Sequence, residues 1–206
     1  MLFAPTLGDL EIRKSGRGGF RVRGRFPYNR TATLSDGGRN GGRLRKERFA
    51  PRAFSYAIED DREIHFLSGH DFGKPLASRK SGSLILEDSD EALTMEATLA
   101  AEIEDTTWGR DFISAHRAGL VVGLSPGFRI PPKTAVPDAE VVEEEDPAEW
   151  RALIRTINAA VLFEISAVTR PAYEDAALAE SRSWALPSDP PVMTVDRRVQ
   201  FHRRWR

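Results

Sequence analysis

The chain has 206 residues, of which 40% are hydrophobic and 30% are charged, and its formal net charge is -1; these values are ordinary for one soluble globular domain with room for tails. It contains no cysteine, which excludes disulfides, thiolate nucleophiles and cysteine–zinc sites and fits an intracellular location. No segment approaches the roughly 20 apolar residues of a membrane-spanning helix, and the first residues lack the pattern of a secretory signal.

Charge is distributed unevenly along the chain. Residues 1–56 hold thirteen Arg and Lys against four Asp and Glu, residues 138–149 hold seven acids and no base, and residues 196–206 are basic again. The ordinary interpretation of such runs is solvated surface. The alternative is docking onto charged partners, including the protein's own tail on its acidic segment.

Short strands dominate the first hundred residues. Apolar residues alternate there with polar ones, as in half-buried strands, and turns rich in glycine or proline separate the runs. The runs predict strands within residues 1–16, 19–35 and 63–70, a glycine-rich loop at 35–45, a strand end followed by a short helix at 47–61, and a hairpin over 81–100.

The second half combines one helix with further strands. Trp108, Phe112 and Ile113 at helical spacing, with Gly119 as the stop signal, predict a helix over 106–119. The chain is predicted to be a mainly β domain with few helices, of the α+β or barrel kind, and the absence of βαβ alternation argues against a doubly wound fold. The remaining predictions are a strand at 120–130, a mobile acidic loop at about 131–149, a strand pair at 150–169, a helix beginning within 170–182, a domain end near residue 180, and a basic tail at 181–206.

Three apolar segments each carry one reactive side chain where the apolar pattern is interrupted. They are His70 in IHFLSGHDFGKPL, Ser125 in GLVVGLSPGFRI and Glu164 in AVLFEISAVTRPAY. Together they supply the base, the nucleophile and the acid of a serine hydrolase. Their chain order, His–Ser–acid, differs from the orders of the best-known triad enzymes.

Each of the three also has a purely structural interpretation. Ser125 shares its predicted strand face with Gly123 and Gly127, so we expect an open face there, but it could also be an ordinary hydroxyl beside a Pro-Gly turn. His70 could be a structural histidine at a strand end. Glu164 has apolar neighbours and therefore needs a partner, for which an imidazolium and an arginine are equally suitable.

Five phrases in register resemble the prohead protease family of tailed bacteriophages, the serine proteases of capsid maturation. They are ERFAPRAF, LSGHDFGKPLA, SGSLILEDSDEALTMEATL, RAGLVVGLSPGF and LFEISAVTRPAYEDAAL, and the resemblance covers roughly residues 10–180. It implies a fold related to the herpesvirus assemblin protease, a mainly β barrel surrounded by helices. It also implies that His70 is the base, Ser125 the nucleophile and Glu164 the third member of the triad.

The resemblance implies an endopeptidase that acts inside the assembling procapsid, in the cytoplasm of the bacterial host. Its substrates would be scaffold protein, or the scaffold-like arm of the capsid protein, and its own ends. For the oxyanion, Arg170 and the backbone amides near Gly127 are competing hypotheses. No metal, organic cofactor or membrane partner is implied, a homo-oligomer is left open, and the particle could be a phage or a domesticated gene transfer particle.

Two other classes of function remain as alternatives. One is a non-catalytic capsid assembly or scaffold-binding factor that acts through its charged tails. The other is a nucleic-acid-binding protein that uses the basic N-terminal face. Against the second, Phe20, Phe26 and Tyr28 occupy core positions of predicted strands, and no recognition helix or stacking motif appears.

Overall fold

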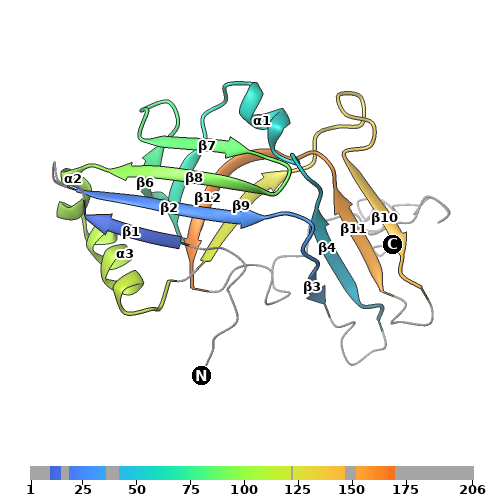
Figure 1. Ribbon diagram of the computed structural model, residues 1–206, viewed down its shortest axis with the longest axis horizontal. Helices are drawn as coiled ribbons and strands as arrows, with labels where there is room; N and C mark the ends of the chain where they lie inside the picture. Colours follow the sequence, from blue (N-terminus) through green and yellow to red (C-terminus); the bar gives the residue numbers. More distant parts are fainter. Residues whose placement is uncertain (1–9, 15–18, 36–41, 122, 147–151, 170–206) are drawn as a thin grey trace, which may run out of the picture.

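Strands make up half of the described part of the protein, which in this computed structural model comprises residues 10–14, 19–35, 42–121, 123–146 and 152–169 (Figure 1). They form three four-stranded sheets. Sheet A has the order β1 (Leu10–Lys14), β2 (Phe20–Pro27), β8 (Ala92–Leu99), β7 (Leu84–Asp88). Sheet B has the order β10 (Glu140–Glu144), β11 (Leu153–Ile157), β4 (Arg45–Phe49), β3 (Ala32–Ser35). Sheet C has the order β6 (Asp71–Ser78), β5 (His65–Ser68), β12 (Val161–Val168), β9 (Gly123–Arg129).

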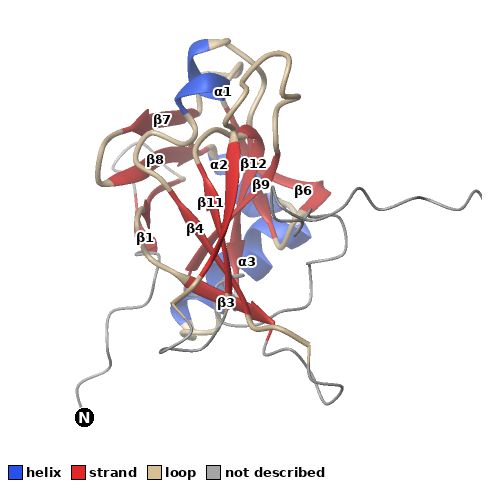
Figure 2. Cartoon of the chain, turned by 90° about the vertical axis from the view of Figure 1, so that its right-hand side faces the viewer, coloured by secondary structure: helices blue, strands red, loops and turns tan. Residues whose placement is uncertain are grey.

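The mainly β class is confirmed, but the expected barrel is not supported. A barrel needs every strand to have two neighbours, whereas each sheet here is open in the described part of the chain and ends in two edge strands. Sheet A instead lies over sheet C, and sheet B extends to one end of the molecule (Figures 1 and 2). The two stacked sheets approach closely at Gly24, where a Cβ would lie 2.3 Å from Leu124 Cδ1.

Three short helices accompany the sheets within the described segments. They are α1 (Ser55–Glu59), α2 (Ala101–Asp105) and α3 (Thr107–Arg117). The predicted helix at 106–119 is confirmed as α3, in which the Thr106 side chain accepts a hydrogen bond from the Gly109 amide at the start, and Gly119 follows its end with φ +71°. Helix α2, which has five residues, was not predicted.

Five aromatic rings join the three sheets in the core. Phe26 comes from sheet A, Phe49 from sheet B and Phe128 from sheet C, and the Phe49 ring centroid lies 5.3 Å from that of Phe26 and 5.0 Å from that of Phe128. Phe54 stacks on Phe49 at 5.1 Å, and Tyr28 lies 6.2 Å from Phe54. This aromatic cluster holds sheet B against the other two sheets.

The acidic segment contains a strand, so the predicted loop at 131–149 is wrong for its central part. Glu140–Glu144 form β10, which pairs antiparallel with β11. Basic side chains of neighbouring strands neutralise its charge: Arg155 of β11, only 3% exposed, lies between Glu140 and Glu47, with 3.1 Å from Arg155 Nη1 to Glu47 Oε2. Further ion pairs join Glu145 to Lys46, Glu144 to Arg43 and Glu143 to Arg48.

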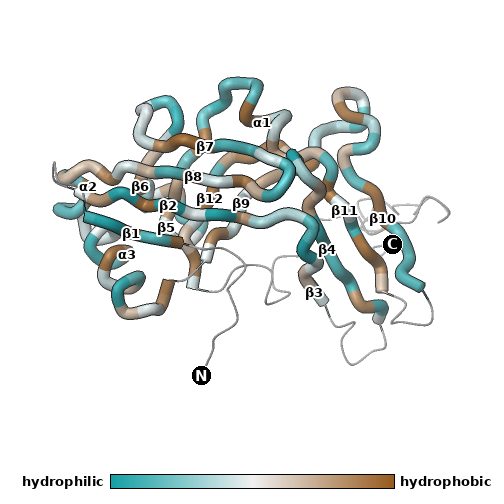
Figure 3. Tube along the Cα trace, viewed as in Figure 1, coloured by the Kyte–Doolittle hydropathy of each residue, from teal (hydrophilic) through white to brown (hydrophobic). Residues whose placement is uncertain are grey.

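Hydrophilic and hydrophobic residues are mixed along the described chain (Figure 3). None of the helices in the described segments is long and apolar enough to cross a membrane. The predicted helix at 170–182, the domain end near residue 180 and the basic tail at 181–206 lie outside the described residues.

Candidate active site

His70 lies in a two-residue hairpin turn between β5 and β6. Ser68 pairs with Asp71, and the two turn residues, Gly69 and His70, have φ values of +67° and +61°. Positive φ at both central positions is the pattern of a type I′ turn, which asparagine and glycine ordinarily occupy. A histidine in the left-handed region is uncommon, and such residues persist where the surrounding structure holds them.

Two hydrogen bonds attach this turn to β12. The Gly69 amide donates to the Ala167 carbonyl at 3.0 Å, and the His70 amide donates to the Ser166 hydroxyl at 2.9 Å. Strand β12 pairs parallel with β5, so the turn projects beside β12 and brings His70 over it.

Glu164 of β12 is buried, at 4% exposure, and both of its carboxylate oxygens have partners. Oε1 lies 2.8 Å from His70 Nδ1, and Oε2 accepts a hydrogen bond from the Ser166 hydroxyl at 2.6 Å. The imidazole is therefore the partner that the apolar setting of Glu164 required. No arginine of the described segments forms an ion pair with Glu164.

Ser125 lies on β9, which pairs with β12, the strand that carries Glu164. In the antiparallel register Ser125 pairs with Ser166 and Gly127 pairs with Glu164, so these four side-chain positions share one face of sheet C. No hydrogen bond between Ser125 and His70 is present in the described structure.

The prediction of an open face at Ser125 is wrong, since Ser125 is only 3% exposed. The small neighbour Gly127 does not leave free space, because the Glu164 carboxylate occupies it: a Cβ at Gly127 would lie 1.9 Å from Glu164 Oε1. Gly127 thus makes room for the carboxylate. Arg170, the other residue considered for the oxyanion, lies outside the described residues.

The geometry defines a role for each ring nitrogen of His70. An ionised carboxylate only accepts hydrogen bonds, so Glu164 selects the tautomer with hydrogen on Nδ1. Nε2 is then the nitrogen that can take a proton from a hydroxyl, as general base catalysis requires.

Sequence reasoning considered Ser166 only as a replacement nucleophile if Ser125 proved dispensable, and did not predict its position beside His70 and Glu164. Ser166 is fully buried and contacts both His70 and Glu164. The signal was present in the sequence, since Glu164 and Ser166 are two residues apart on a predicted strand and must share a face. The two other histidines of the described segments have different environments: His65 contacts the Phe72 ring edge-on, and His116 Nδ1 lies 3.0 Å from the Val121 carbonyl oxygen.

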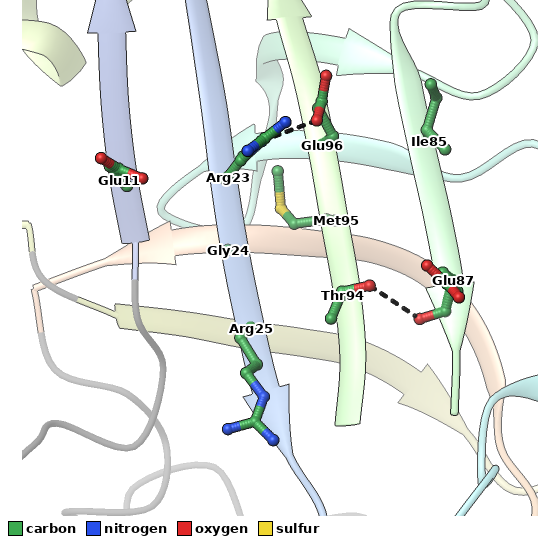
Figure 4. Close-up of a pocket in the computed structure, with 9 residues that line it drawn as sticks. All are labelled: Glu11, Arg23, Gly24, Arg25, Ile85, Glu87, Thr94, Met95 and Glu96. Atoms are coloured by element: carbon green, nitrogen blue, oxygen red, sulfur yellow. Dashed lines mark hydrogen bonds and ion pairs between the residues drawn. The ribbon is translucent and has the colours of Figure 1, made fainter. Parts of the chain in front are cut away.

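The described residues contain no group of three or more His, Asp or Glu side chains that could hold a metal ion. A cleft of about 460 Å³ lies on the outer face of sheet A (Figure 4). Its lining includes basic and acidic side chains, with Arg23 and Glu96 paired at 2.8 Å, and none of His70, Ser125 and Glu164.

Comparison with known proteins gives one similarity. A family model described as caudovirus prohead serine protease matches residues 35–186, a range that includes all three candidate residues. No curated protein and no solved structure gives a match with the chain.

Proposed function

Because the chain belongs to the caudovirus prohead serine protease family, we propose that it is the endopeptidase of capsid maturation and that His70, Ser125 and Glu164 are its catalytic triad. The observation that carries this proposal is the hydrogen bond between the buried Glu164 carboxylate and His70 Nδ1, with Ser125 on the adjacent strand of the same sheet. A carboxylate, an imidazole and a hydroxyl in this relation can carry out acyl transfer.

In the proposed mechanism, Ser125 Oγ attacks the scissile carbonyl carbon while His70 Nε2 takes the hydroxyl proton. The imidazolium, stabilised by the Glu164 carboxylate, then donates that proton to the leaving amine. A water molecule deprotonated by His70 hydrolyses the acyl-enzyme and returns Ser125 to its starting state. Backbone amides near Gly127 are our candidates for the oxyanion donors.

The substrates that we propose are scaffold protein, or the scaffold-like arm of the capsid protein, and the ends of the protease itself. Cleavage would take place inside the procapsid in the host cytoplasm. Since Ser125 is 3% exposed and the His70 side chain 33% exposed, substrate would approach from the side of the hairpin turn.

The test is to incubate the purified protein with its scaffold and capsid proteins and to identify fragments by mass spectrometry. Ser125→Ala and His70→Ala should each lower the cleavage rate on the order of 10³-fold or more, and the double variant should be little worse than either, because the two residues act as a unit. A fluorophosphonate probe should label Ser125 in the wild type and not in His70→Ala.

The matched control is Ser114→Ala, which removes an exposed hydroxyl from α3 and should cleave like the wild type. Fragments produced equally by Ser125→Ala would refute the assignment of the nucleophile. A wild type that binds scaffold without cleaving it would favour the non-catalytic assembly factor.

A further inference from the structure

We propose that Ser166 is a positioning residue of this site, whose hydroxyl holds both the base and the acid of the triad in place. The inference rests on the proposed function and adds a fourth residue to it. Ser166 is fully buried on β12 and lies directly across from Ser125 in the strand register. Because its side chain is closed to solvent, its effect on the reaction must pass through its neighbours.

Its first neighbour is the Glu164 carboxylate. The last side-chain torsion of a glutamate is broad, so one hydrogen bond at Oε1 leaves the carboxylate free to swing. The Ser166 hydroxyl donates to Oε2 at 2.6 Å while His70 Nδ1 lies 2.8 Å from Oε1. These two contacts on opposite oxygens fix the plane of the carboxylate and direct Oε1 at the imidazole.

Its second neighbour is the backbone of His70. The same hydroxyl oxygen accepts the His70 amide hydrogen at 2.9 Å. A serine hydroxyl has one hydrogen to donate and lone pairs to accept with, so the two contacts are compatible. The second contact holds His70 in its left-handed conformation, with φ +61°, which orients the ring toward Glu164.

This arrangement also excludes Ser166 as a second nucleophile. Its hydrogen is engaged by a carboxylate that already serves His70, and the side chain is inaccessible. A positioning role requires the hydroxyl, whereas a packing role requires only the volume, and substitutions can separate the two.

The experiment compares Ser166→Thr with Ser166→Val, which add the same bulk and differ in the hydroxyl. We expect Thr to exceed Val in kcat by about tenfold or more, and Ser166→Ala to lose about 10- to 100-fold in kcat with KM within about twofold of the wild type, as for loss of hydrogen bonds to a charged group. The control is Ser55→Ala, which removes a serine hydroxyl that donates to the Asp88 carboxylate at 3.0 Å, away from the site; its kcat should be unchanged.

A second readout does not depend on activity. The hydrogen-bonded Nδ1 proton of His70 should give a low-field NMR resonance that is absent in His70→Ala. It should shift or broaden in Ser166→Ala and Ser166→Val and persist in Ser55→Ala and Ser166→Thr. Equal kcat values for Thr and Val, or a Ser166→Ala resonance identical to that of the wild type, would overturn the proposal. A wild type that shows the resonance and its dependence on Ser166 but cleaves nothing would instead refute the proposed function.

Discussion

His70, Glu164 and Ser166 form one closed set of hydrogen bonds around a buried carboxylate. Burying a charge is costly unless it is paired and hydrogen-bonded, and here both oxygens of Glu164 have partners. Removing one partner of a buried pair leaves an uncompensated charge and is strongly destabilising. The same hydrogen bonds therefore contribute to the stability of the fold and to the proposed catalysis, so each variant must be measured for both stability and activity.

Glu164→Gln separates the two contributions. The amide keeps the shape of the side chain, removes the charge and can stabilise the wrong tautomer of His70. We expect kcat to fall about 10²-fold, which is less than for Ser125→Ala because nucleophile and base survive. The measurement is kcat per folded molecule together with a thermal melt. A lower Tm with unchanged kcat would contradict the orienting role.

Gly127→Ala tests the space that the carboxylate occupies. The added methyl group would meet Glu164 Oε1 at 1.9 Å, so we expect Glu164 to be displaced from His70 and the cleavage rate to fall at least tenfold, although the Gly127 amide is kept. In a Glu164→Ala background the same change should lower the rate little further, because the clash is gone. An equal loss in both backgrounds would indicate that Gly127 acts through its own backbone instead.

Asp88 connects α1 to the strands of sheet A. Its carboxylate accepts hydrogen bonds from the Phe54 amide at 3.1 Å, the Ser55 hydroxyl at 3.0 Å and the Tyr28 hydroxyl. Burial nevertheless raises the pKa of Asp88 above its ordinary value of 3.8. The hydrogen bonds thus only partly offset the loss of solvation.

The raised pKa of Asp88 gives a pH dependence of defined sign. Below pH 3.8, the pKa of Asp88 in the unfolded chain, the carboxyl is protonated in both the folded and the unfolded state. Its contribution to the free energy of unfolding is then fully present. That contribution is lost as the pH rises through the higher folded-state pKa, since the native state binds the proton more tightly. We expect the unfolding free energy of the wild type minus that of Asp88→Asn, measured by urea denaturation from about pH 3.5 to 7, to decrease with pH. A difference that rises with pH would contradict this assignment.

The negative charges of strand β10 are compensated by ion pairs with basic residues of neighbouring segments. Within EVVEE, Val142 is buried at 8% exposure. The glutamates lie beside basic residues such as Arg155 of β11 and Arg48 of β4. Arg155, with a carboxylate on either side, links three strands of sheet B. Glu140, Glu143, Glu144 and Glu145 are therefore paired with basic residues of the described chain.

The three sheets depend on one another through the aromatic cluster. Phe26, Phe49 and Phe128 each come from a different sheet, and the Phe49 ring contacts the other two as well as Phe54. Cleavage activity and the integrity of sheet B should therefore be lost together on unfolding.

Phe49→Ala tests this coupling. Phe49 is 2% exposed, and truncation of a buried phenylalanine costs about 3–5 kcal/mol, so we expect a loss of that order in the unfolding free energy, measured by chemical denaturation as one cooperative transition. Phe72→Ala is the control, because Phe72 is 61% exposed and its removal should cost less than about 1 kcal/mol. Two separate transitions in the Phe49 variant would show that sheet B unfolds independently.

Local pattern was sufficient to predict most of the elements of this protein. The period-2 runs became β2, β5, β7 and β8, and the capped helical run became α3. The need of Glu164 for a partner could also be inferred, because the desolvation of a carboxylate among apolar neighbours is a local property. The sequence by itself thus determined the mainly β class and three segments with reactive side chains.

Only the tertiary structure decided how those segments meet. The parallel pairing of β5 with β12 brings His70 to Glu164 across 94 residues of sequence, and the pairing of β9 with β12 sets Ser125 against Ser166. The pairing of β10 with β11 makes the acidic segment a strand, and the packing of the sheets buries Ser125. Register and burial depend on contacts between distant segments, whose energies no local spacing contains, and for that reason they could not be predicted from the chain alone.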